Sequence, residues 1–259
     1  STANKVGEVL NFSQLNLGAA VVDYQFSKDE SKILLITNIE LIYRHSYLAH
    51  CFVYDIATKK LTSVAKEKIR LAEFSPNSQK VAYVSNNNIF IFDIASLQTK
   101  QITTDGEYNH IINGTTDWVY EEEFAITKGF FWSNDSEKIA YYKFDESKVK
   151  QFSMTIYGDL YPMEYVYKYP KAGEDNSVVE IFVYDLKSDK TNHIDMGLNK
   201  DIYLPRLQWT PNDEVFIHKL NRHQNQYELF IASTNDFKPK KIYEERNQYY
   251  IEQVEDVVF

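Results

Sequence analysis

Apolar and polar residues alternate in short runs along residues 71–103, which is the pattern of half-buried β-strands. One apolar run ends at Phe74, a second covers 81–84, a third alternates through 89–93, and a last strand is predicted near 101–103. Ser, Asn and Asp residues separate the runs, and their side chains hydrogen-bond nearby backbone and tolerate left-handed geometry. The segment therefore predicts four short strands joined by tight turns.

The same unit recurs along the chain. Its first strand ends in an aromatic residue followed by Ser or Thr and a polar turn, at Phe26-Ser27, Phe74-Ser75, Trp132-Ser133 and Trp209-Thr210. Its third strand carries an alternating apolar signature at 52–56, 90–94, 182–186 and, more weakly, 228–231. Repeated four-stranded meanders, which cannot bury both faces alone, are typical of a β-propeller. The predicted fold class is therefore all-β, with antiparallel meanders as propeller blades. A regular β-sandwich explains the strands but not the recurring unit.

The number of repeated units predicts how many propeller blades the chain contains. The third unit is interrupted by a long insertion between Asp145 and Asn176, and the residues Tyr249–Phe259 read as the opening strand of a fifth unit. An unclosed propeller leaves an edge strand open to pairing with another chain. We therefore expect residues 1–259 to form one incomplete propeller domain of four to five blades, belonging to a larger ring.

The amino-acid composition argues against a nucleic-acid partner, a membrane span and an internal disulfide. The 259 residues include 28 Lys and Arg against 37 Asp and Glu, which gives a formal net charge of −9. Nucleic acid is disfavoured as a partner, because neutralising phosphates needs clustered basic side chains. No apolar run approaches the ~20 residues that would span a bilayer. The single cysteine, Cys51, excludes an internal disulfide and reads as a small buried hydrophobic residue.

Motifs of covalent catalysis and of cofactor binding are absent from the sequence. The eight glycines never fall at the Gly-x-Ser-x-Gly spacing of a nucleophile elbow. Neither a phosphate-cradling Gly-rich loop nor a His-Glu-x-x-His motif occurs. The six histidines are scattered and read as ordinary polar or core residues: His45, His50, His110, His193, His218 and His223. We therefore expect no cofactor, no metal site and no catalytic residue in this chain.

An acidic segment lies between the second and third units, where residues 117–124 read Asp-Trp-Val-Tyr-Glu-Glu-Glu-Phe. Asp117 is a good N-cap, so a short helical turn is predicted after it. Successive side chains of a helix point ~100° apart, so two adjacent carboxylates can converge on a cation if the turn faces a cavity. Alternatively, the carboxylates complement the helix N-terminus in water, worth ~0.3–1 kcal/mol. The flanking Trp118, Tyr120 and Phe124 favour a turn that is pinned to the protein body. The residues alone leave both interpretations open.

This segment resembles a motif of the dipeptidyl peptidase IV family of serine peptidases. Asp117–Glu123 matches the family's Asp-Trp-Val-Tyr-Glu-Glu-Glu motif residue for residue. Three further elements match in the family's order: Arg-His-Ser-Tyr at 44–47, the blade after the Glu motif at 132–141, and Tyr-Pro-Lys-Ala-Gly at 169–173. The resemblance runs over most of the chain from Val21 onward and is weakest after residue 199.

The resemblance implies an eight-bladed N-terminal propeller over a C-terminal α/β-hydrolase domain that holds the catalytic Ser, Asp and His. Glu122 and Glu123 correspond to the family carboxylates that bind the free α-amino group of a peptide substrate. Arg44 corresponds to the arginine that helps to hold the substrate backbone near them. Two carboxylates that bind the ammonium fix the position of the peptide's N-terminus. Because an extended residue spans only ~3.3–3.6 Å, this also fixes which peptide bond reaches the catalytic residues. An internal peptide bond would leave both carboxylates unpaired.

The function implied is that of the propeller part of an exopeptidase that releases N-terminal dipeptides with a penultimate Pro or Ala. We expect this part to bind the substrate's amine and to gate access, and to be inactive as an isolated fragment. Two alternatives stay open: a non-catalytic propeller that binds a peptide or protein partner, and a tripeptidyl relative, which shares the Glu motif. Taken without the resemblance, Arg44 reads as a structural ion pair.

The resemblance also has consequences for partners and location. Phe152–Tyr169 resembles an arm that packs against a second subunit, which implies a homodimer, while a long surface hairpin is the alternative. After Glu123 the chain looks one residue shorter than the vertebrate enzymes and lacks their nearby Ser, which affects details of the substrate pocket but not the ammonium site. The family points to an extracytoplasmic location, in the periplasm or at the surface of a bacterial cell.

Overall fold

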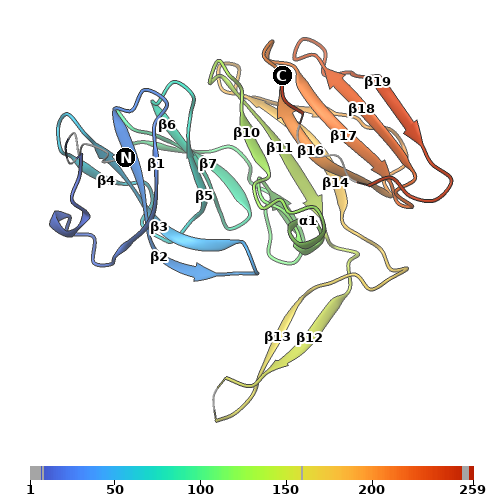
Figure 1. Ribbon diagram of the computed structural model, residues 1–259, viewed down its shortest axis with the longest axis horizontal. Coiled ribbons are helices and arrows are strands. Elements are labelled where there is room, and N and C mark those ends of the chain that lie inside the picture. The colour runs from blue at the N-terminus through green and yellow to red at the C-terminus, as the bar shows by residue number, and fades with distance from the viewer. Residues whose placement is uncertain (1–6, 8, 159, 253–256) are drawn as a thin grey trace, which may run out of the picture. The chain divides into compact units, whose positions relative to one another are not determined.

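The chain folds almost entirely into antiparallel β-structure (Figure 1). The computed structural model describes residues 7, 9–158, 160–252 and 257–259. Two compact units can be distinguished. The N-terminal unit comprises Ser1–Tyr83 with Ile91–Thr99, and the C-terminal unit comprises Val84–Phe90 with Lys100–Phe259.

Four sheets share one plan, in which strands that follow one another in sequence pair with their immediate neighbours. The first sheet contains β1 (Val21–Phe26), β2 (Lys32–Leu41), β3 (Tyr47–Asp55) and β4 (Leu61–Ser63). The second contains β5 (Arg70–Phe74), β6 (Lys80–Ser85), β7 (Asn88–Asp93) and β8 (Thr99–Gln101). The third contains β10 (Phe130–Trp132), β11 (Lys138–Asp145), β14 (Val178–Asp185) and β15 (Lys190–Ile194), and β9 (Ile111–Asn113) also pairs with β11. The fourth contains β16 (Ile202–Trp209), β17 (Val215–Asn221), β18 (Gln226–Ala232) and β19 (Pro239–Arg246). The prediction of repeated four-stranded meanders is confirmed.

The first hairpin of each sheet closes on the Ser or Thr that follows its terminal aromatic residue. In three sheets the Ser hydroxyl oxygen accepts a hydrogen bond from the backbone N–H five residues later, at 2.9–3.0 Å, in the pairs Ser27–Lys32, Ser75–Lys80 and Ser133–Lys138. In the fourth sheet the turn is one residue shorter, and Thr210 accepts from the N–H of Glu214 at 3.1 Å. A side-chain acceptor thus satisfies a donor that the tight turn leaves free.

The third strands confirm the second part of the repeat, since the apolar signatures fall on β3, β7, β14 and β18, the first three running one residue past the end of the strand. In three of them the strand ends in an Asp whose Oδ1 accepts the N–H of the residue three positions later. These pairs are Asp55–Thr58, Asp93–Ser96 and Asp185–Ser188, at 2.8, 2.9 and 2.7 Å. Such Asx turns reverse the chain into the fourth strand of each sheet.

The insertion in the third unit forms a hairpin of its own. β12 (Gln151–Ile156) and β13 (Met163–Lys168) pair antiparallel as a two-stranded sheet that projects away from the other sheets of its unit (Figure 1). We call 151–168 the arm. Its tip exposes large apolar side chains to between 62% and 90% of their area: Tyr157, Leu160, Tyr161 and Met163. The segment forms a hairpin, which both interpretations of the insertion allow, and its contact with a second subunit stays a prediction.

One predicted strand is shifted along the sequence, and a second falls partly on residues outside the described part of the chain. The last strand of the second sheet is Thr99–Gln101 and not 101–103, because the hydroxyl of Thr103, and not its backbone, accepts the N–H of Ile89 at 2.9 Å. No strand occurs in the described part of Tyr249–Phe259. The buried Ile251 donates its N–H to the backbone oxygen of Gln224 at 2.8 Å, and residues 253–256 lie outside the described residues.

Two helices complete the described part of the chain: a 3₁₀ turn, η1 (Phe12–Gln14), and α1 (Trp118–Glu123). In that same part, no helix has the length and apolar character that crossing a membrane requires.

Each unit has its own core. In the N-terminal unit, Cys51 on β3 is 4% exposed, and burial raises the pKa of its thiol to about 12. The prediction of a small buried hydrophobic residue at Cys51 is confirmed. In the C-terminal unit, a larger cluster of buried side chains includes Tyr142 and Phe144 of β11 and extends to α1.

Candidate functional site

The helix α1 follows β9 in the C-terminal unit and begins at the predicted cap. The Oδ1 atom of Asp117 accepts the backbone N–H of Tyr120 at 2.9 Å, and the hydroxyl of Ser177 donates to Oδ2 at 2.6 Å. A six-residue helix is not stable by itself, because the cost of nucleation exceeds what so few backbone hydrogen bonds return. The position of α1 therefore depends on its contacts with the rest of the unit.

The three consecutive glutamates of α1 differ in exposure. Glu121 is fully buried, Glu122 is half-buried and Glu123 is exposed. This sequence of environments follows from the ~100° turn between successive helical residues. The interpretation that all three carboxylates are solvated is wrong for Glu121, whereas Glu122 and Glu123 form an adjacent pair on the solvent side of the helix.

Aromatic rings hold α1 against the third sheet and the arm. The ring of Tyr120 packs edge-on against Phe144 of β11, with ring centroids 4.8 Å apart. The ring of Trp118 contacts Tyr169, which directly follows the arm, at 4.4 Å. Burial raises the pKa of Tyr167 on β13, and the negative charge of Glu122 adds to this effect. The base of the arm therefore lies near Glu122.

A second buried carboxyl group lies near the cap of α1. Glu146 directly follows β11 and is 6% exposed. Burial, and then the charge of Asp117, raise its pKa from 4.5 to about 7, and the charges of Lys168 and His110 act in the opposite direction. Burial also raises the pKa of Asp117. Glu146 could not be identified from the sequence, because nothing in the run Asp-Glu-Ser distinguishes it from a polar loop.

Arg44 lies in the N-terminal unit, in the loop between β2 and β3, and is exposed. A backbone hydrogen bond of 2.9 Å from the N–H of Ile42 to the oxygen of Ser46 closes this loop. The structure thus brings Glu122 and Glu123 together on one helix, and the role of Arg44 toward them stays a prediction.

The histidines do not form a site. His218 on β17 is fully buried, and its Nδ1 lies 2.7 Å from the hydroxyl of Tyr227. Burial lowers the pKa of His218 to about 4, so its ring is neutral at pH 7. The prediction of a core histidine is confirmed at this position. The described residues include no group of three His, Cys, Asp or Glu side chains that could hold a metal ion.

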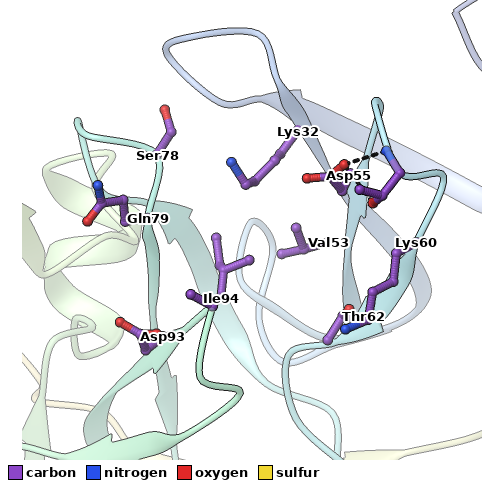
Figure 2. Close-up of a pocket in the computed structure, with 11 residues that line it drawn as sticks. Lys32, Val53, Asp55, Lys60, Thr62, Ser78, Gln79, Asp93 and Ile94 are labelled. Carbon is purple, nitrogen blue, oxygen red and sulfur yellow. Dashed lines mark hydrogen bonds between the residues drawn. The ribbon is translucent and has the colours of Figure 1, made fainter.

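A cavity of about 410 Å³ in the N-terminal unit is the second candidate (Figure 2). Figure 2 shows charged and apolar residues side by side in its lining, among them Lys32, Asp55, Val53 and Ile94. Its carboxylates already have partners, since Asp55 accepts two hydrogen bonds from Thr58 at 2.7 and 2.8 Å and Asp93 pairs with Lys80 at 2.8 Å. Asp55 and Asp93 also belong to the turn motif that recurs in the third sheet. The Glu122–Glu123 pair is therefore the stronger candidate site.

Comparison with known proteins identifies relatives of the chain. A family model described as the dipeptidyl peptidase IV (DPP IV) N-terminal region matches residues 27–259. Dipeptidyl aminopeptidase B of Saccharomyces cerevisiae is 33% identical over 216 residues, which cover 80% of this chain and 26% of that protein. Dipeptidyl peptidase 4 of Sus scrofa is 33% identical over 226 residues, covering 81% of this chain and 29% of that protein.

The crystal structure of Porphyromonas gingivalis dipeptidyl peptidase 4 superposes on the chain with a TM-score of 0.85 and 39% identity. The match covers 89% of this chain and 33% of that one. It confirms the all-β fold of propeller blades. The chain spans between about a quarter and a third of the length of these relatives.

Proposed function

Since the chain belongs to the dipeptidyl peptidase IV family, as its match to the family's N-terminal region shows, we propose that it is the propeller part of a serine exopeptidase. The enzyme releases N-terminal dipeptides with a penultimate Pro or Ala. In this proposal catalysis resides in a C-terminal α/β-hydrolase domain, as the resemblance to the family implies. The observation that carries the proposal is the adjacent pair Glu122–Glu123 on the solvent side of a helix that is capped and packed in place.

The pair binds the α-ammonium group of the substrate. An ammonium has three donors and no acceptor, whereas ionised carboxylates only accept, so Glu122 and Glu123 match it in charge and in hydrogen bonding. Charge-assisted hydrogen bonds of this kind are about twice as strong as neutral ones. Arg44 corresponds to the family's arginine that helps to hold the substrate backbone, and its guanidinium group is suited to donate hydrogen bonds to backbone carbonyls. Because the ammonium is held at a fixed place, the enzyme cleaves the peptide bond that lies at a fixed distance from the substrate's N-terminus. The propeller restricts which substrates reach the catalytic residues.

The test of this function compares free and blocked substrates of the full-length protein. We expect a Gly-Pro reporter to be cleaved and its N-acetylated form to be cleaved at least about a hundredfold more slowly, because acetylation removes the charge that both carboxylates bind. The 259-residue chain alone is the control and should cleave neither. Equal cleavage of the two reporters would refute the proposal. Release of tripeptides would assign the chain to a tripeptidyl enzyme, and absence of hydrolysis by the full-length protein would favour a non-catalytic binding propeller.

We also propose that the arm pairs with the arm region of a second copy. Large apolar side chains at the tip are exposed to 79–90% at Tyr157, Leu160 and Tyr161, and burying them stabilises an interface by about 25 cal/mol per Å². The exopeptidase is placed outside the cytoplasm, in the periplasm or at the cell surface, as the resemblance implies.

Replacing Tyr157 and Leu160 together by Ser should convert a dimer of the full-length protein into a monomer. Analytical ultracentrifugation measures this change. Leu198→Ser is a matched control, since Leu198 is 99% exposed on a turn outside the arm, and it should leave the dimer intact. A double variant that remains dimeric at the same concentration would show that the arm tip is not the interface.

A further inference from the structure

The strand β16 has a bulge that contacts α1. Tyr203 pairs with Leu220 and Arg206 pairs with His218, so two residues of β16 lie opposite one residue of β17. A bulge interrupts the ladder and changes the direction of nearby groups. The N–H of Leu204, within this bulge, donates to the hydroxyl oxygen of Tyr120 at 2.8 Å. The middle of α1 is therefore attached to the fourth sheet by a specific hydrogen bond.

The guanidinium group of Arg206 binds the other end of the helix. Its Nη1 atom donates to the backbone oxygen of Phe124, the C-cap of α1, at 2.9 Å, and to the oxygen of Pro205 at 2.7 Å. The last carbonyls of a helix have no partner within it and carry partial negative charge, so a cation there is favourable. Ala125 follows with a φ of 55°, a conformation that is strained for a residue other than glycine. The helix end thus depends on an external contact to keep its geometry.

The residues around Arg206 keep its guanidinium group in position at the end of α1. The neighbouring ring of His218 is neutral at pH 7, because burial and then the charge of Arg206 lower its pKa to about 4. His218 is fixed in turn by the hydroxyl of Tyr227 at 2.7 Å. Arg206 therefore has a rigid and uncharged neighbour, and its cation is directed to the carbonyl that directly follows Glu123.

We infer that Arg206 is a positioning residue for the amine-binding pair: by capping α1 at Phe124, it fixes the direction of Glu122 and Glu123. This role rests on the proposed function. Specificity for the free N-terminus then depends partly on the fourth sheet. Arg206, which belongs to that sheet, lies 82 residues along the chain from the Phe124 carbonyl that it binds.

The test uses the full-length protein and a Gly-Pro reporter. Arg206→Met keeps the length of the side chain and removes the donor, and we expect KM to rise about tenfold while kcat stays within about twofold. A tenfold change corresponds to about 1.4 kcal/mol of lost binding energy. Arg206→Lys retains one donor for the Phe124 carbonyl and should give an intermediate KM. In a background with both Glu122→Gln and Glu123→Gln, Arg206→Met should lower kcat/KM by less than about twofold further, because both groups that it positions are already lost.

The matched control is Arg246→Met, which removes an arginine that pairs with Glu244 on the exposed strand β19 of the same sheet. It should leave KM unchanged. The inference is overturned if Arg206→Met has a normal KM, or if its effect adds fully to that of replacing Glu122 and Glu123 together. Should Arg206→Met not fold, Arg206→Lys and Tyr120→Phe carry the same test, and normal KM values for both would overturn it. If replacing Glu122 and Glu123 themselves has no effect, the proposed function fails instead.

Discussion

Replacing Glu122 and Glu123 together by Gln in the full-length protein is expected to lower kcat/KM for a Gly-Pro reporter by at least about a hundredfold. Gln keeps the size of the side chain and its helix propensity, so α1 should persist. What is lost is the negative charge: a hydrogen bond to a charged group is worth about 1.5–3 kcal/mol, and two of them amount to about 3–6 kcal/mol. Because about 1.4 kcal/mol is a factor of ten, the expected loss lies between about 10² and 10⁴.

The single variants separate the two carboxylates. Glu122 is half-buried and Glu123 is exposed, so water screens Glu123 more strongly, and Glu122→Gln should be the more damaging change. Glu67→Gln, which removes an exposed carboxylate in the N-terminal unit, is the control and should have no effect. The rate at which an amine-free serine reagent inactivates each variant reports whether the hydrolase is intact. An unchanged kcat/KM in the double variant would show that the pair does not bind the substrate's amine.

The features that the sequence predicted correctly are those encoded locally. The hairpins were found because Ser27, Ser75 and Ser133 hydrogen-bond backbone only five residues away. The start of α1 was found because Asp117 accepts the N–H of a residue three positions later. In both cases the side chain that causes the structure stands next to it in the sequence, so composition and spacing are sufficient.

The features that the sequence could not supply depend on distant residues. Ser177 supports the cap of α1 from 60 positions away, and Arg206 holds its end from 82. Nor does a run of three identical glutamates indicate which of them faces the core, because that is decided by how Tyr120 packs against Phe144. The resemblance named Glu122 and Glu123, but the burial of Glu121 and the bulge in β16 required the structure.

Glu146 makes the fold sensitive to pH, and Glu146→Gln is expected to stabilise the protein at pH 8 while leaving its stability at pH 4 nearly unchanged. Burial, and then the charge of Asp117, raise the pKa of Glu146 from its ordinary value of 4.5 to about 7. Between these two values the folded state binds more protons than the unfolded state. The free energy of unfolding therefore falls as the pH rises from about 4.5 to about 7, and it levels off above that range.

The size of the effect follows from the difference between the pKa values of Glu146 in the folded and unfolded states. One pKa unit corresponds to about 1.4 kcal/mol, so the ionised Glu146 destabilises the folded state by up to about 3 kcal/mol at pH 8. Gln is close in shape to the protonated carboxyl group and carries no charge at any pH, so the variant avoids this cost. Urea unfolding between pH 4 and pH 8 measures the difference. Glu164→Gln, on the exposed face of the arm, should change stability by less than about 0.5 kcal/mol at either pH. If Glu146→Gln unfolds with the same pH dependence as the unchanged protein, then Glu146 is ionised at no cost and another group determines that dependence. The remaining slope in the variant would then point to Asp117, whose pKa burial raises in the same direction.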